Sequence, residues 1–130
     1  MNVSKIGKIS NIAKPVLLLA ILELIEKKYI SENKIYYTIE LKEEYNYIYR
    51  EYKKDSIVTP VYYPYYYLKK ESFYILNGQI NRKTPSYRYI IENIQYVQFD
   101  DDLWILLQVK ENREKIKTII KKIIDQYNII

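Results

Sequence analysis

Residues 61–76 read VYYPYYYLKKESFYIL, and they set the architecture that we expect for the chain. They place a proline among five tyrosines and continue through two short runs, residues 65–68 and 73–76, that are rich in strand-favouring side chains. The polar residues 69–72 between the runs can form a turn. Asn77 and Gly78 follow, a pair that favours a type I′ turn because both central positions need positive φ. The sequence therefore predicts a small antiparallel β-hairpin near residues 65–80.

Pro64 stands in the middle of the tyrosines. Because proline has no backbone N–H and a fixed φ, we expect it to end the preceding segment and to hold Tyr62 and Tyr63 extended. Aromatic rings and the proline ring would then be presented together at the mouth of the hairpin. Two interpretations are open: the tyrosines are half-buried strand residues, or the cluster is a binding surface.

Composition limits the classes of function. The 130 residues predict one domain spanning 1–130, and the absence of cysteine and histidine excludes disulfides, thiol nucleophiles, His-based acid–base catalysis and His or Cys zinc sites. We expect no enzyme activity and no cofactor or metal. The net charge of +5 favours a polyanionic partner such as nucleic acid. No secretion signal or membrane segment is predicted, which suits a cytoplasmic protein.

Apolar periodicity and capping residues predict a mostly helical α+β fold. The first helix opens at Lys14-Pro15 and is apolar on nearly every face, so we expect it to be long, buried and central. We expect about four to five helices, arranged around this long buried first helix. Their expected ranges are 14–26, 38–53 with Thr38 as N-cap, 84–95 with Thr84-Pro85 at the start, 100–107, and 112–127.

Three charged groups are candidates for a site. Lys14 would hold its ammonium near the free N–H groups of the first helical turn, where an anion could bind both, or it is a solvated lysine. Arg82 and Lys83 occupy a loop beside the tyrosines and could contact phosphate or base, or they are merely solvated. The acidic run 100–102 could resemble a metal site, but we interpret it as a helix start.

Several motifs occur in a fixed order: KPVLLLA at 14–20, PYYYL at 64–68, FYIL at 73–76, and DDDLW at 100–104, followed by Leu106, Leu107 and Arg113. In this order and spacing, residues 14 to about 127 resemble the sulfur-binding domain found N-terminal to HNH nuclease domains in phosphorothioate-dependent restriction endonucleases. The resemblance implies a mostly helical domain that binds double-stranded DNA in which sulfur replaces one non-bridging phosphate oxygen.

The resemblance also implies roles for individual residues. Tyr63 and Pro64 would line an apolar sulfur pocket, and Tyr67 would take the place of a side chain that can be small in the family. Lys14 would stand where an arginine often follows a histidine, with Ala13 at the histidine position. Sulfur is larger and more weakly hydrated than oxygen, so an apolar pocket accepts it at little desolvation cost.

The expected function is a non-catalytic module that recognises phosphorothioated, or otherwise modified, double-stranded DNA in restriction or phage defence. Since the chain carries no HNH motif, it would work as a recognition module or recruit a separate nuclease subunit. The alternative is a protein-interaction subunit of such a complex that has lost sulfur binding, with the tyrosine patch buried against its partner.

Overall fold

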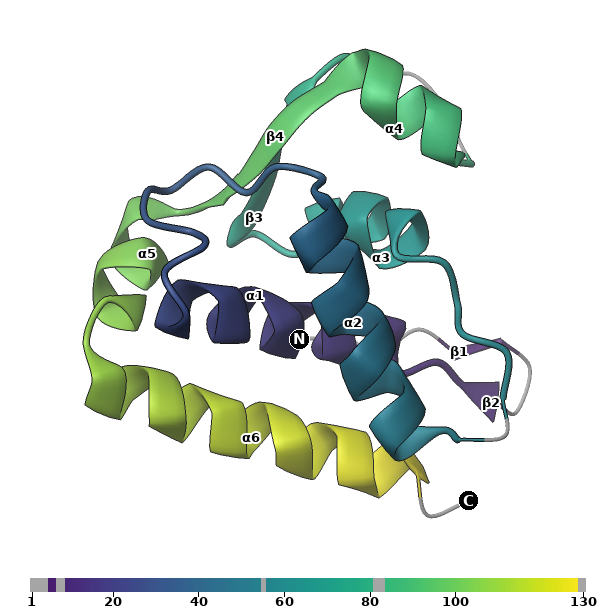
Figure 1. Cartoon of the computed structure of the whole chain (residues 1–130), viewed down its shortest axis with the longest axis vertical. Coiled ribbons are helices and arrows are strands. Elements are labelled where there is room, and N and C mark those ends of the chain that lie inside the picture. Colours follow the sequence, from purple (N-terminus) through teal and green to yellow (C-terminus); the bar gives the residue numbers. More distant parts are fainter. Residues whose placement is uncertain (1–4, 7–8, 55, 81–83, 129–130) are drawn as a thin grey trace.

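The computed structural model describes residues 5–6, 9–54, 56–80 and 84–128. These residues form six α-helices, one 3-10 turn and two small antiparallel sheets (Figure 1). In chain order the elements are β1 (Lys5–Ile6), β2 (Ile9–Ser10), α1 (Ala13–Glu26), α2 (Ile39–Tyr52), α3 (Tyr62–Tyr67), η1 (Leu68–Lys70), β3 (Tyr74–Gly78), α4 (Tyr87–Asn93), β4 (Ile94–Phe99), α5 (Asp101–Leu107) and α6 (Lys110–Asn128). The expected mostly helical α+β class is confirmed.

Helix α1 is the centre of the fold, as its composition predicts. All of its residues are buried except Glu23 and Glu26, and it packs against α2, α3 and α6 (Figure 1). A helix that is apolar on every face must be surrounded by other elements to remove that surface from water. The arrangement therefore follows directly from the sequence of residues 13–26.

The prediction that residues 65–68 form the first strand of a hairpin is wrong. Tyr62–Tyr67 form helix α3, and the residues expected to turn continue it as η1. At helical spacing Tyr65, Tyr66 and Leu68 all become fully buried, which a strand with alternating sides would not allow. Pro64 is the third residue of α3, where the backbone N–H would have no partner inside the helix, so proline costs little there.

Strand β3 pairs instead with β4, from Tyr74 opposite Phe99 to Asn77 opposite Tyr96. Helix α4 lies between the two strands in the chain, and it is shorter than the helix predicted over 84–95. The N-cap of α4 is Ser86, whose hydroxyl accepts a hydrogen bond from the N–H of Tyr89 at 3.1 Å, and the last residue of α4 is Asn93. The residues that follow are strand-favouring, and pairing with β3 takes them out of the helix.

Gly78 ends β3 at an irregularity in the pairing with β4 rather than forming the predicted type I′ turn. Its φ is +151°, and a Cβ at this position would overlap the carbonyl oxygen of Asn93. Only glycine permits both the backbone conformation and this close approach. The Asn77-Gly78 pair therefore does mark a position that requires glycine, but this position is a bulge in the pairing of β3 with β4.

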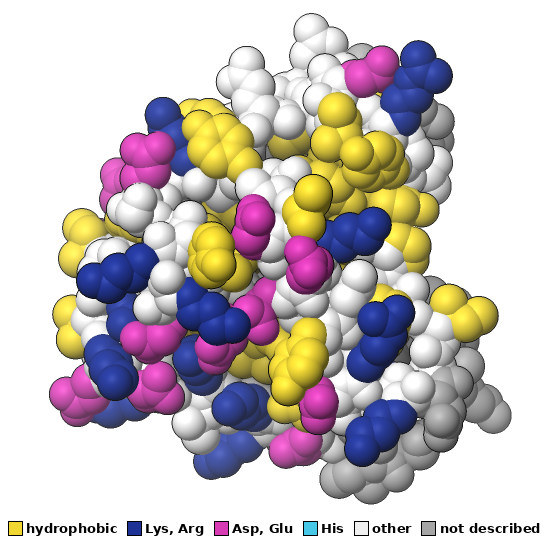
Figure 2. All heavy atoms as spheres, in the orientation of Figure 1, with side chains coloured by type: hydrophobic (Ala, Val, Ile, Leu, Met, Phe, Trp, Pro, Cys, Tyr) yellow, Lys and Arg dark blue, Asp and Glu magenta, His cyan; other side chains and the backbone are white. Residues whose placement is uncertain are grey.

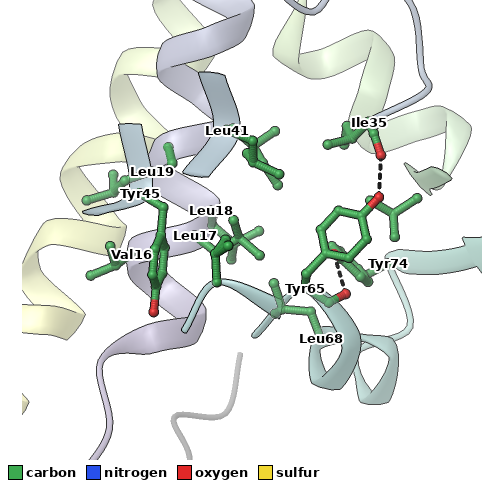
Figure 3. Close-up of a cluster of buried hydrophobic side chains, with 14 of the residues drawn as sticks. Val16, Leu17, Leu18, Leu19, Ile35, Leu41, Tyr45, Tyr65, Leu68 and Tyr74 are labelled. Atoms are coloured by element: carbon green, nitrogen blue, oxygen red, sulfur yellow. Dashed lines mark hydrogen bonds between the residues drawn. The ribbon is translucent and has the colours of Figure 1, made fainter. Parts of the chain in front are cut away.

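Hydrogen bonds from buried tyrosines connect the elements around α1. The Tyr65 hydroxyl donates to the carbonyl of Ile35 at 2.7 Å, and the Tyr74 hydroxyl donates to the carbonyl of Tyr65 at 2.7 Å (Figure 3). Ile35 itself forms a single antiparallel bridge with Val97 of β4. These bonds satisfy polar atoms that would otherwise be buried without partners.

Two predicted helix caps are confirmed. The Thr38 hydroxyl accepts from the N–H of Leu41 at 3.1 Å, and the Asp100 carboxylate accepts from the N–H of Leu103 at 2.8 Å. The acidic run therefore begins α5, as interpreted. Among the described residues no helix is both long and apolar enough to cross a membrane.

Helix α6 packs its isoleucines on α1, but two cations also face inward. Lys117 is buried and lies 2.7 Å from the Glu23 carboxylate of α1. Arg113 is also buried and pairs with Glu26 at 3.3 Å. The two acidic residues of α1 that escape full burial are thus the ones that anchor α6.

Candidate nucleic-acid interface

Helix α3 lies against the N-terminal part of α1 (Figure 1). Val16 and Leu17 of α1 share one buried cluster with Tyr65 and Leu68 (Figure 3). Because these inward side chains fix the two elements together, the remaining residues of α3 and the start of α1 belong to one region. That region contains four of the residues that sequence reasoning selected: Lys14, Tyr63, Pro64 and Tyr67.

Lys14 is the second residue of α1 and is only 5% exposed, so it is not the solvated cap residue that was the simpler expectation. No carboxylate of the described residues lies within salt-bridge distance of its ammonium. Burial, followed by the charge of nearby Lys70, lowers the pKa of Lys14, while Glu71 opposes this in part. The site thus contains a poorly solvated cation near the positive end of a helix dipole.

Tyr63 and Tyr67 are half-buried and lie one helical turn apart on α3. Their ring centroids are 4.7 Å apart, and Tyr67 also makes an edge contact with Tyr66 at 5.4 Å. Pro64, which we expected to be presented to solvent, is buried. The accessible apolar surface of this region therefore comes mainly from Tyr63 and Tyr67, and the Tyr67 ring covers part of Tyr63.

Lys69 and Lys70 join this region although the sequence assigned them to a hairpin turn. The Lys69 ammonium lies 4.0 Å from the centroid of the Tyr66 ring and donates to the Tyr66 hydroxyl at 2.9 Å. The Lys70 ammonium lies 5.4 Å from the centroid of the Tyr67 ring. Both pairs are separated by three residues, so a helical interpretation of residues 62–70 would have found them.

We call Lys14, Tyr63, Tyr67, Lys69 and Lys70 the tyrosine–lysine surface. It combines flat aromatic faces with three ammonium groups, a set suited to holding phosphates beside apolar or aromatic groups of a ligand. Arg82 and Lys83, the other predicted contacts, lie outside the described residues, so the structure does not relate them to this surface.

The rest of the charge is not concentrated in the same way. On the face in Figure 2, lysine and arginine side chains alternate with acidic ones over α2 and α6, and hydrophobic side chains gather near α4 and α3. Several of the cations on these helices are paired, including Lys27 with Glu44 at 2.6 Å and Lys115 with Glu111 at 3.4 Å. Pairing reduces what such lysines can offer to an anion.

Comparison of the sequence with models of known protein families gives no match, and no curated protein matches it. The likeness to the sulfur-binding domain therefore stays a prediction from the motifs in this chain.

Proposed function

We propose that the chain is a non-catalytic module that binds double-stranded DNA through the tyrosine–lysine surface. The observation that carries the proposal is the largely buried side chain of Lys14, whose ammonium has no carboxylate partner within salt-bridge distance among the described residues. Such a partly desolvated cation costs free energy in the unbound protein, and an anion bound beside it would recover part of that cost. A phosphate group has the charge and the acceptor oxygens for this role.

The other residues of the surface extend the contact along a polyanion. Lys69 and Lys70 are kept close to the rings of Tyr66 and Tyr67 by cation–π contacts, which limits the number of conformers that must be ordered on binding. Three lysines on one surface predict a slope of about −3 in log K against log salt, at roughly 0.9 per phosphate contact. A protein partner with mixed charge would not give this dependence.

We further propose that the preferred DNA carries sulfur in its backbone, which rests on the motif resemblance and on the side chains around Lys14. The apolar face of Tyr63 would accept a weakly hydrated sulfur atom while the lysines hold the neighbouring phosphates. In this role Tyr67 is a cover over Tyr63 that is displaced when the sulfur binds.

The experiment is a pair of titrations followed by fluorescence anisotropy, with matched duplexes that differ in one phosphorothioate. Sulfur recognition predicts tighter binding of the modified duplex at every salt concentration, and backbone binding predicts the slope given above. Binding with the slope but no sulfur preference would retain the DNA module and discard the sulfur reader. No binding to either duplex would overturn both.

A protein-interaction role is the second candidate, because a different group of tyrosines is exposed. Tyr36 and Tyr87 are 46% and 60% exposed, and their rings pack at a tilt against Tyr96 and Tyr37, with centroid distances of 5.7 and 6.0 Å. Exposed tyrosines that are already ordered are typical of protein interfaces. Loss of a co-purifying partner on Tyr87→Ala, with unchanged DNA binding, would support this second role.

A further inference from the structure

An apolar pocket lies on another part of the molecule, among α1, Phe73 just before β3, the end of β4, α5 and α6. Its volume is about 240 Å³, and every side chain that lines it is apolar. The floor is formed by buried residues: Leu18, Leu22, Phe99, Leu107 and Ile120. An engineered apolar cavity of about 150 Å³ is large enough to bind benzene, so this pocket can accept a ring or an alkyl group.

The pocket opens along α6. Ile116 and Ile123 line it and are half-buried, while Ile119 lines it and is 56% exposed. These three residues lie on one side of α6 by their spacing of three and four. Because the wall is exposed at Ile119 and the floor is buried, an occupant can enter from solvent and leave its outer end at Ile119.

Two lysines flank this opening. Lys115 precedes Ile119 by four residues and Lys122 follows it by three, so both neighbour Ile119 on the surface of α6. Both are exposed, and among the described residues Lys122 has no carboxylate within salt-bridge distance. Lys115 forms an exposed ion pair with Glu111 at 3.4 Å. The outer edge of a wholly apolar pocket therefore carries positive charge.

We propose that this pocket binds a small anionic amphiphile, with an alkyl chain inside it and a carboxylate at Lys115 and Lys122. The lining has no group that could satisfy a polar atom, so the buried end of the ligand must be apolar and its polar end must remain at the mouth. The lysines then select an acid over an alcohol or an amine. The site shares no residue with the tyrosine–lysine surface, so this inference does not depend on the DNA-binding proposal.

The test uses the full chain and three probes with the same chain length: decanoate, decanol and decyltrimethylammonium, each below its micelle-forming concentration. Binding is followed by calorimetry and by the fluorescence of Trp104, the single tryptophan, which adjoins the pocket residue Leu103. We expect saturable binding of one decanoate per chain, with weaker binding of decanol and the weakest binding of the cation.

Three variants assign the site. Ile123→Phe fills the pocket and should weaken the binding of both decanoate and decanol by about tenfold or more. The double variant Lys115→Glu, Lys122→Glu leaves the lining of the pocket intact. It should weaken the binding of decanoate by about tenfold, whereas the affinity for decanol should change by less than about twofold. Lys121→Glu is the matched control, because Lys121 is exposed on another side of α6 and should leave both affinities unchanged.

The proposal is overturned if wild type shows no saturable decanoate binding, or if neither the filling variant nor the double charge variant alters it. Equal loss of decanoate and decanol in the double charge variant would refute the carboxylate at the mouth. Self-association that Ile119→Glu abolishes, without decanoate binding, would instead assign the pocket to a second copy of the chain.

Discussion

Replacing Lys14 by methionine should stabilise the protein and weaken its binding to DNA at the same time. Methionine keeps an unbranched apolar side chain of similar length and removes only the ammonium. Lys14 is 5% exposed and pairs with no carboxylate of the described residues, so its charge opposes folding. If Lys14 were instead an ordinary structural lysine, its removal would destabilise the protein and leave DNA binding unchanged.

The two expected effects have different sizes. Burying a polar group without a compensating partner costs about 1–3 kcal/mol. Because the ammonium keeps some access to water, we expect Lys14→Met to raise the free energy of unfolding by an amount near the lower end, about 1 kcal/mol. This corresponds to a rise in Tm of about 3–6 °C for a domain of this size. Loss of one charge-assisted hydrogen bond to phosphate costs about 1.5–3 kcal/mol, or roughly 10- to 150-fold in Kd.

The pH dependence of the stabilisation gives a further check. The pKa of Lys14 is lowered in the folded protein, so the unfolded chain binds this proton more tightly than the folded one. The cost of the charge is therefore complete below the folded pKa and disappears as pH rises toward the unfolded value of about 10.5. The difference in Tm between Lys14→Met and wild type should accordingly shrink as the pH rises toward 10.5.

The assays are thermal unfolding followed by circular dichroism, and anisotropy titration with a duplex at several salt concentrations. Lys42→Met is the matched control, because Lys42 is exposed on α2 and has no ion pair with a described residue. It should change neither Tm nor affinity appreciably. A Lys14→Met protein with lower Tm and wild-type affinity would refute the reasoning.

Three further outcomes follow from single features of the structure. Tyr67→Ala uncovers Tyr63 and should strengthen the preference for a phosphorothioated duplex, whereas Tyr63→Ala should reduce it and leave salt-dependent binding in place; titrations of both duplexes decide this. Gly78→Ala should lower the free energy of unfolding by about 2 kcal/mol or more in urea titrations, because its φ is positive and its Cβ would meet the carbonyl of Asn93; an unchanged midpoint would contradict the bulge. Burial raises the pKa of Tyr65 and Tyr74, so the stability that they provide is complete below about pH 10 and is lost as pH rises above it. Exposed tyrosines should ionise first, in the folded protein, and the remaining tyrosinate absorbance should appear together with loss of helical circular dichroism. Ionisation of all tyrosines without unfolding would refute this.

Sequence reasoning identified the helical core because α1 gives an unambiguous signal. A segment such as PVLLLAIL cannot be placed at a surface, and Thr38 and Asp100 mark helix starts by a local hydrogen bond that their side chains form wherever a helix follows. Such features depend on neighbours in the chain and are readable without knowledge of the fold.

The tyrosine-rich stretch was misassigned because its residues favour a strand locally but are placed by tertiary contacts. Tyr65 reaches Ile35 and accepts from Tyr74, and these long-range bonds hold residues 62–67 as a helix. The partner of β3 was missed for the same reason, since β4 follows only after α4. Strand propensity depends on such context more than helix propensity does.

The candidate site was predicted in part. Tyr63 and Pro64 were expected at the mouth of a hairpin and Tyr67 in its first strand. All three belong to helix α3 instead, and α3 packs on α1 because both elements bury apolar side chains in one cluster. The burial of Lys14 had no signal in the sequence, since a lysine at a helix start is ordinarily solvated. Lys69 and Lys70 were missed because their contacts with Tyr66 and Tyr67 exist only in helical geometry.

The central claim is tested most directly by comparing wild-type affinity for three duplexes of one sequence: unmodified, and carrying a single phosphorothioate in each of its two diastereomers. Desolvation of one oxygen relative to sulfur predicts that one diastereomer binds more tightly than the unmodified duplex by about 1–3 kcal/mol, roughly 5- to 150-fold. The other diastereomer points its sulfur away from the surface and should bind like the unmodified duplex. Equal affinity for all three duplexes, with both wild type and Tyr67→Ala, would contradict sulfur recognition by this chain.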